Sequence, residues 1–109
     1  MMHLIDITSI RELYKKQMVQ LTFHFQDKIE ERIITHANIK AIINKGEIIE
    51  QYPDNEPNPS ALLHGYTDEN KPLHIVVGIG DDGYLRLITA YFPTLDRWED
   101  DYKTRKAGV

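Results

Sequence analysis

Three side chains capable of acid–base chemistry stand out in the second half of the chain: His64, His74 and Tyr91. A histidine titrates near neutral pH, and both imidazole and phenol can pass a proton within a hydrogen bond. Two histidines on neighbouring strands could instead share a metal, but a third ligand is needed and cysteine is absent. They could also be structural, bonded to hydroxyls or to the backbone. We predict no metal or cofactor and name His74 and Tyr91 as candidate catalytic residues.

A second set of polar side chains lies at four-residue spacing in the first half: His24, Lys28 and Arg32. Residues four apart line one stripe of a helix, so the three should project together. A basic stripe beside a cleft could hold a phosphate. We therefore predict His24 as a third catalytic residue and Lys28 and Arg32 as phosphate-binding residues. The alternative is structural, with Arg32 fixing a helix end and Glu30 and Glu31 as surface partners.

Short strands are expected to position the histidines and the tyrosine. Alternating or continuous apolar runs indicate strands over residues 46–53, 61–66, 72–79 and 84–93. Polar turns at 67–71 and 80–83 are short enough to join antiparallel neighbours. The sequence therefore predicts a four-stranded antiparallel sheet over the second half of the chain.

The register of this sheet decides which side chains meet, because successive residues face opposite sides. If the turns are as short as they look, His64 lies opposite His74, His74 opposite Thr89, and Pro72 opposite Tyr91. One face should then carry His64, Tyr66, His74, Thr89 and Tyr91 with Leu62, Val76, Leu85 and Leu87. The other face, purely apolar and covered by helices, should carry Leu63, Leu73, Ile75, Val77, Ile79, Ile88 and Phe92.

Helices are expected before the sheet. Thr8 and Ser9 could cap a first helix reaching Met18, Thr22 a second over 23–32, and Thr35 a third. Residues 19–21 look extended. Gly46 should end the third helix in a left-handed conformation.

The complete prediction is an α+β fold in a single domain, 1–109. N-terminal helices precede a four-stranded antiparallel sheet and a short C-terminal helix. That last helix is expected from the three- and four-residue spacing of Leu95, Trp98 and Tyr102. Residues 103–109 should be flexible.

Charge and composition limit the functional classes. A net charge of −4 argues against a general nucleic-acid binder. The charge is uneven: residues 1–46 hold seven basic and five acidic side chains, whereas 47–93 hold two basic and eight acidic ones. A polyanion should therefore meet the helical half. The absence of cysteine favours a reducing cytoplasm, and we expect no signal peptide and no membrane span.

The ordered combination of these motifs resembles a bacterial family, domain of unknown function 4258. The resemblance covers about residues 22–106, and two departures are Lys28, where the family has Arg, and Ile33, where it has Gly. The matching segments are His24, Lys28 and Arg32; residues 46–53; residues 72–74; Thr89, Tyr91 and Pro93; and residues 98–101 and 105–106.

Two functional hypotheses from different classes follow. The first is a non-catalytic protein-interaction module that uses the open sheet face or edge to bind a small antitoxin-like or other protein partner. The second rests on the resemblance, since the family is similar in plan to the RelE/ParE toxin group. It would be a toxin such as an endoribonuclease, with His74 and Tyr91 transferring protons and the basic stripe holding RNA phosphate.

Overall fold

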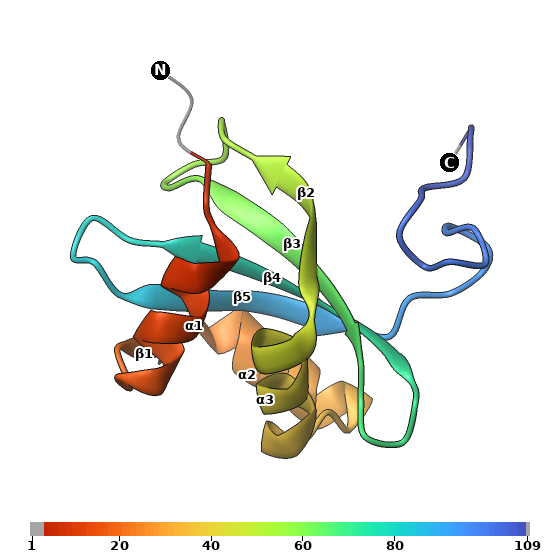
Figure 1. Cartoon of the computed structure of the whole chain (residues 1–109), viewed down its shortest axis with the longest axis horizontal. Helices are drawn as coiled ribbons and strands as arrows, with labels where there is room; N and C mark the ends of the chain where they lie inside the picture. Colours follow the sequence, from red (N-terminus) through yellow and green to blue (C-terminus); the bar gives the residue numbers. More distant parts are fainter. Residues whose placement is uncertain (1–3, 109) are drawn as a thin grey trace.

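Helices cover one face of a five-stranded sheet (Figure 1). The C-terminal segment contacts the other face through Trp98 and Tyr102, which lie against His74. This computed structural model describes residues 4–108. Residues 1–3 and Val109 lie outside the described residues. The first belong to the N-terminus for which no signal peptide was predicted, and Val109 belongs to the tail that was predicted to be flexible. The elements are α1 (Ile7–Lys15), β1 (Val19–Leu21), α2 (Phe23–Arg32), α3 (His36–Lys45), β2 (Glu47–Tyr52), β3 (Ser60–Tyr66), β4 (Pro72–Ile79) and β5 (Leu85–Tyr91).

The sheet is mixed rather than wholly antiparallel. Its strand order is β1-β5-β4-β3-β2, and the pairs β2–β3, β3–β4 and β4–β5 are antiparallel as predicted. The prediction of four strands is wrong by one, because Val19–Leu21 pairs in parallel with Leu85–Leu87. Three residues are too few to show a strand period, and their partner is distant in the sequence.

Side-chain caps fix where the helices begin. The hydroxyls of Thr22 and Thr35 accept from Phe25 N and Asn38 N at 3.0 and 3.1 Å, so both predicted caps are confirmed. The first helix instead begins earlier than predicted. Its cap is Asp6, whose carboxylate accepts from Ser9 N at 2.8 Å.

Two helix ends depart from the expected use of glycine. Gly46 has φ −79° and ψ −175°, which is extended and not left-handed as predicted. Glycine is required there for space, because a Cβ would lie 2.5 Å from the Ile42 carbonyl oxygen and 2.7 Å from that of His64. At the end of α2, by contrast, the C-cap residue Ile33 is left-handed, with φ 56°.

The hydrophobic core lies between the helices and one face of the sheet. Helix α3 packs on β3 and β4, and α2 packs on β5. One face of the sheet is therefore covered by helices, as predicted. The buried side chains of the core include Ile10, Phe25, Ile39, Ile42, Ile43, Leu63, Leu73, Ile75, Val77, Leu85 and Leu87. Within residues 4–108, the helices are too short or too polar to cross a membrane.

The C-terminal helix predicted around Trp98 is wrong. Residues after β5 form turns, with one isolated bridge between Trp98 and Arg105. Backbone bonds from Glu99 N to Thr104 O and from Lys106 N to Arg97 O close this loop back on itself. The aromatic residues of the segment are therefore held by turns and by contacts with the sheet, and not by a helical stripe.

Candidate functional site

Strands β3, β4 and β5 bring His64, His74 and Tyr91 together on the face away from the helices. His64 pairs with His74 across β3–β4, which confirms the first register prediction. His74 pairs with Tyr91 across β4–β5, whereas the sequence predicted Thr89 at that place. The grouping of the three side chains on one face is nevertheless as predicted.

Two compensating shifts explain this result. The β4–β5 turn is one residue longer than predicted, since Ile79 pairs with Leu85. A bulge after Leu87 then adds a second residue, so the predicted alternation is restored from Thr89 onward. Between the two shifts the alternation is inverted. Leu85 and Leu87, predicted for the histidine face, therefore lie in the core, while Ile88, predicted for the core, is only half-buried.

The hydrogen bonds of His74 determine its tautomer. The Tyr102 carbonyl lies 2.7 Å from His74 Nε2 and can only accept, so Nε2 carries the hydrogen. The same N–H faces His64 Nδ1 at 3.1 Å. His74 Nδ1 keeps its lone pair and accepts from the Tyr91 hydroxyl at 3.2 Å. Both imidazoles are thus arranged as neutral rings, and the hydrogen of His64 stands on its Nε2.

Burial keeps these rings neutral. His74 is 0% exposed, and removal from water lowers its pKa from 6.5 to about 4. Burial likewise lowers the pKa of His64 and raises the pKa of the Tyr91 hydroxyl. Within the described part of the chain, the buried Nε2 of His64 has no hydrogen-bond partner. At neutral pH the cluster therefore holds no imidazolium charge.

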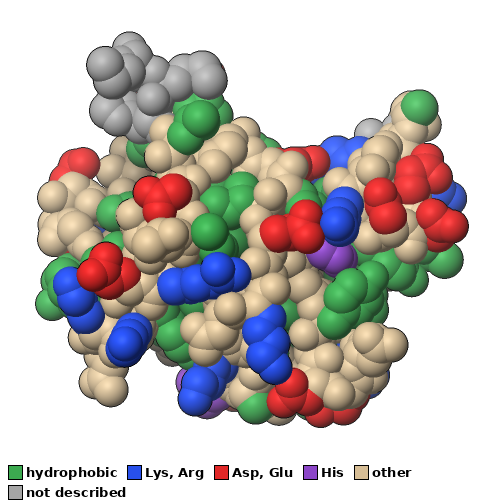
Figure 2. All heavy atoms as spheres, in the orientation of Figure 1, with side chains coloured by type: hydrophobic (Ala, Val, Ile, Leu, Met, Phe, Trp, Pro, Cys, Tyr) green, Lys and Arg blue, Asp and Glu red, His purple; other side chains and the backbone are tan. Residues whose placement is uncertain are grey.

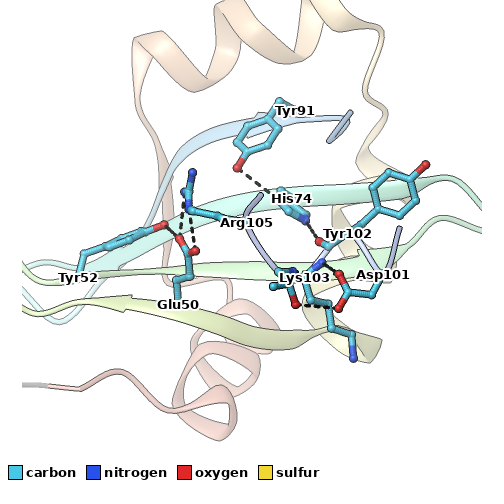
Figure 3. Close-up of polar contacts among 9 residues, drawn as sticks. Glu50, Tyr52, His74, Tyr91, Asp101, Tyr102, Lys103 and Arg105 are labelled. Atoms are coloured by element: carbon cyan, nitrogen blue, oxygen red, sulfur yellow. Dashed lines mark hydrogen bonds and ion pairs between the residues drawn. The ribbon is translucent and has the colours of Figure 1, made fainter. Parts of the chain in front are cut away.

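A cover formed by Trp98, Tyr102 and Arg105 closes this face. Figure 3 shows Tyr102 and Arg105 beside His74. The Trp98 ring meets the His74 ring edge-on, with centroids 4.6 Å apart and an interplanar angle of 87°. The Arg105 guanidinium donates hydrogen bonds to both carboxylate oxygens of Glu50, at 2.8 and 3.0 Å. Because this cover buries His74, a substrate has no access to that side chain in this state.

Glu50, Tyr52 and Arg105 were missed as members of this cluster. The Tyr52 hydroxyl bonds Glu50, and the Arg105 guanidinium also lies 4.6 Å from the centre of the Trp98 ring. Burial raises the pKa of Glu50, but the bonds from Arg105 and Tyr52 outweigh it and lower the pKa. The signal in the sequence was the Glu-x-Tyr spacing, which places two polar groups on one strand face.

The basic stripe of α2 lies along β5 beyond the residues that pair with β1. His24 is exposed, and its Nε2 lies 3.2 Å from the Thr89 hydroxyl, on the histidine face. Arg32 Nη1 donates to the Ala90 carbonyl at 2.7 Å, while Lys28 pairs with Glu31 at 3.0 Å. Arg32 thus satisfies a carbonyl at the strand edge. The roles proposed for His24, Lys28 and Arg32 in catalysis and phosphate binding stay predictions.

A second feature is an open groove between α1, β1 and α3. It has a volume of about 990 Å³ and an apolar floor that includes Val19, Leu21, Ile39 and Leu87. Lysine and arginine side chains border this part of the surface (Figure 2). Among residues 4–108 no three His, Asp or Glu side chains group closely enough to hold a metal ion. The groove is therefore the open candidate site, and the histidine cluster is the covered one.

Comparison with protein families identifies the family to which the chain belongs. The model described as Domain of unknown function (DUF4258) matches residues 21–92, about two thirds of the chain. The chain belongs to the DUF4258 family. Comparisons with curated proteins and with solved structures found no match.

The DUF4258 match includes the histidine cluster but only part of the groove. It runs from the end of β1 to just beyond β5, and so includes His24, His64, His74 and Tyr91. It stops before Trp98, although the resemblance seen in the sequence extended to residue 106. Helix α1, one wall of the groove, also lies outside it. The DUF4258 portion thus supplies the sheet face, and flanking segments supply its cover and part of the groove.

Proposed function

We propose that this domain is a protein-interaction module that binds a partner in the groove between α1 and α3. One observation carries the proposal: the groove is open and has an apolar floor, whereas the acid–base cluster is buried beneath the chain's own C-terminal segment. Open concave surfaces with apolar floors and polar rims are typical of binding sites.

The charges at the rim favour an acidic amphipathic partner segment. Lys15 and Lys40 line the groove, are exposed, and pair with no carboxylate within residues 4–108. Arg11 is not available in the same way, because it donates to the carbonyls of Ile43 and Gly46 at 2.9 and 2.7 Å. A helix with apolar residues on one face and Asp or Glu beside them would complement both floor and rim.

Peptide selection tests this proposal without a known partner. A displayed library of random peptides of about 16 residues, roughly four helical turns, is selected against the whole chain. We expect enrichment of acidic amphipathic sequences. Binding of a selected peptide should weaken about tenfold when Lys15→Glu and Lys40→Glu are combined, as expected for two lost rim charges.

The matched control is Lys71→Glu, which reverses the charge of an exposed lysine in the β3–β4 turn. This variant should bind the selected peptides as the parent chain does. Selection of basic peptides, or equal weakening by Lys71→Glu and Lys40→Glu, would contradict an acidic partner in the groove.

A second proposed function is a RelE/ParE-like toxin that cleaves RNA. The 3.2 Å bond between His74 Nδ1 and the Tyr91 hydroxyl favours it, together with His24 beside Thr89 on the same face. Such a reaction needs one group to take a proton from the ribose hydroxyl and another to protonate the leaving oxygen. The covered state of His74 and the net charge of −4 favour the first proposal.

Induced expression in a bacterial host tests the toxin proposal. Growth arrest with RNA cleavage that His74→Ala abolishes would support it, provided the variant is still folded by circular dichroism. Normal growth and intact RNA with the parent chain would remove it and leave the interaction module.

A further inference from the structure

The covered sheet face has the chemistry of a binding site whose occupant is already in place. Glu50 and Tyr52 lie on β2, and His74 lies on β4, with β3 between the two strands. The C-terminal segment contacts these groups with the Arg105 guanidinium, the Trp98 indole and the Tyr102 backbone carbonyl. These contacts resemble those by which a protein holds a peptide from another chain.

Arginine and tryptophan provide the specific part of this contact. Arg105 binds Glu50 with two parallel bonds, the geometry in which a guanidinium is far better suited than an ammonium. Its guanidinium also stacks over Trp98, whose ring is 2% exposed and packs against His74. Lys103 adds an exposed ion pair with Glu47 at 3.2 Å.

The fit between this segment and the face is incomplete. His64 Nε2 is buried without a partner among residues 4–108, which costs free energy that a ligand with a well-placed acceptor would recover. The two ion pairs are half-exposed, and such pairs contribute little to holding a segment in place. Between residues 94 and 108 the segment forms turns and no regular helix or strand. A competing ligand therefore has both something to gain and a weakly held occupant to replace.

Charge selects the class of ligand. If the C-terminal segment leaves, Glu47 and Glu50 lose their cationic partners, and the His74 ring loses the Trp98 ring that packs on it. The exposed face would then be acidic and aromatic. It would attract a cation and repel phosphate, so a peptide with arginine and an aromatic residue fits better than RNA.

We propose that the outer sheet face is a binding site for a peptide segment of a partner protein that carries an arginine beside an aromatic residue, and that residues 94–108 occupy it in cis until such a segment replaces them. This site is separate from the groove and does not depend on the function proposed for that surface. Its recognition elements are Glu50 for the guanidinium and the His74 ring for the aromatic side chain.

The full-length Trp98→Ala variant gives a direct test, because the chain contains a single tryptophan. The probe is a synthetic peptide with the sequence of residues 94–108, and the anisotropy of its own tryptophan reports binding. We expect saturable binding to this variant. Adding Glu50→Gln should weaken it about tenfold, since a charged bidentate contact is lost. Adding Lys40→Glu, in the groove, should leave it unchanged.

The parent chain gives a second measurement that does not rely on the variant's stability. The probe here is the same peptide with Trp98→Phe, and the parent's own Trp98 emission reports displacement. We expect a shift to longer wavelength only at high peptide concentration, because the attached segment competes at an effective concentration on the order of millimolar.

Three results would overturn the proposal. The first is the absence of saturable binding to a folded Trp98→Ala variant. The second is binding that Glu50→Gln does not weaken or that Lys40→Glu abolishes. The third is parent emission that stays constant up to peptide concentrations well above the millimolar range.

Discussion

The sheet face around His74 and the groove beside Lys40 differ in how their polar groups are satisfied. On the sheet face, imidazole, phenol and carboxylate groups bond one another and the chain's own C-terminal segment. At the groove, exposed lysines stand over an apolar floor without carboxylate partners among residues 4–108.

This difference shows that clustering of polar side chains and exposure of unpaired charges are separate kinds of evidence for function. Residues gathered on a face, such as His64, His74 and Tyr91, look catalytic until their burial is known. Buried polar groups that bond one another stabilise a fold, and removing one leaves its partners unpaired. Unpaired charges beside open apolar surface contribute little to stability, so a binding role explains them better. Stability measurements should therefore distinguish the two regions.

The largest expected effect is that of His74→Ala. The substitution removes a fully buried ring and leaves the Tyr91 hydroxyl and the Tyr102 carbonyl without their partner. We expect the free energy of unfolding to fall by about 3 kcal/mol or more. Urea denaturation followed by circular dichroism measures this. A loss below about 1 kcal/mol would break the comparison, because the sheet face would then be no more structural than the groove.

Acid should destabilise the domain through the same residue. His74 titrates near 6.5 in the unfolded chain and at about 4 in the folded one, so between these values the unfolded state binds the extra proton. Stability should therefore be greatest above pH 6.5 and fall as the pH drops to 4, by up to roughly 3 kcal/mol from this residue.

His74→Gln isolates that contribution from the carboxylates. Its neighbours Glu50, Arg105 and His64 remain in place, so the difference in unfolding free energy between variant and parent should shrink as the pH falls from 7 to 4.5. A difference independent of pH would show that His74 is not held neutral by burial. NMR titration of the His74 ring provides an independent check.

Tyr91→Phe should have a smaller effect on the same cluster. It keeps the ring but leaves the buried Nδ1 of His74 without its donor, so we expect a loss of about 1–2 kcal/mol. The pKa of His74 should change in the same variant, which NMR would detect. The control is Tyr84→Phe, on a half-buried tyrosine outside the cluster, which should change stability by less than about 0.5 kcal/mol.

Ile33→Gly gives a reference value for the change in unfolding free energy at a position outside the sheet face and the groove. Ile33 has φ 56° and an 82% exposed side chain, so a β-branched residue bears left-handed strain and little burial is lost by its removal. We expect a gain of about 1 kcal/mol in unfolding free energy. Ile33→Ala keeps a Cβ in the strained conformation and should give no comparable gain. Equal effects of the two variants would argue against strain.

The smallest expected effect is that of Lys40→Ala in the groove. Lys40 is exposed and has no carboxylate partner within the described residues, so it should contribute less than about 0.5 kcal/mol. The same variant should weaken binding of an acidic peptide selected on the groove, as Lys71→Ala should not. A clear loss of stability would assign Lys40 to the fold and weaken the interaction proposal.

Local chemistry determined what the sequence alone could predict. The caps at Thr22 and Thr35 depend on backbone amides only three residues away, so residue type sufficed. The pairing of His64 with His74 follows from one short turn. The shared face of His74, Thr89 and Tyr91 survived two register errors, because strand alternation has a period of two and the errors cancelled.

Tertiary structure decided everything that joins distant segments. The parallel pairing of β1 with β5 and the Glu50–Arg105 contact each link residues more than 50 positions apart, and no local pattern encodes such partners. The bulge near Ile88 and the turns around Trp98 are also set by packing. Burial of His74 depends on that cover, so the sequence could name the acid–base cluster but could not show that it is closed.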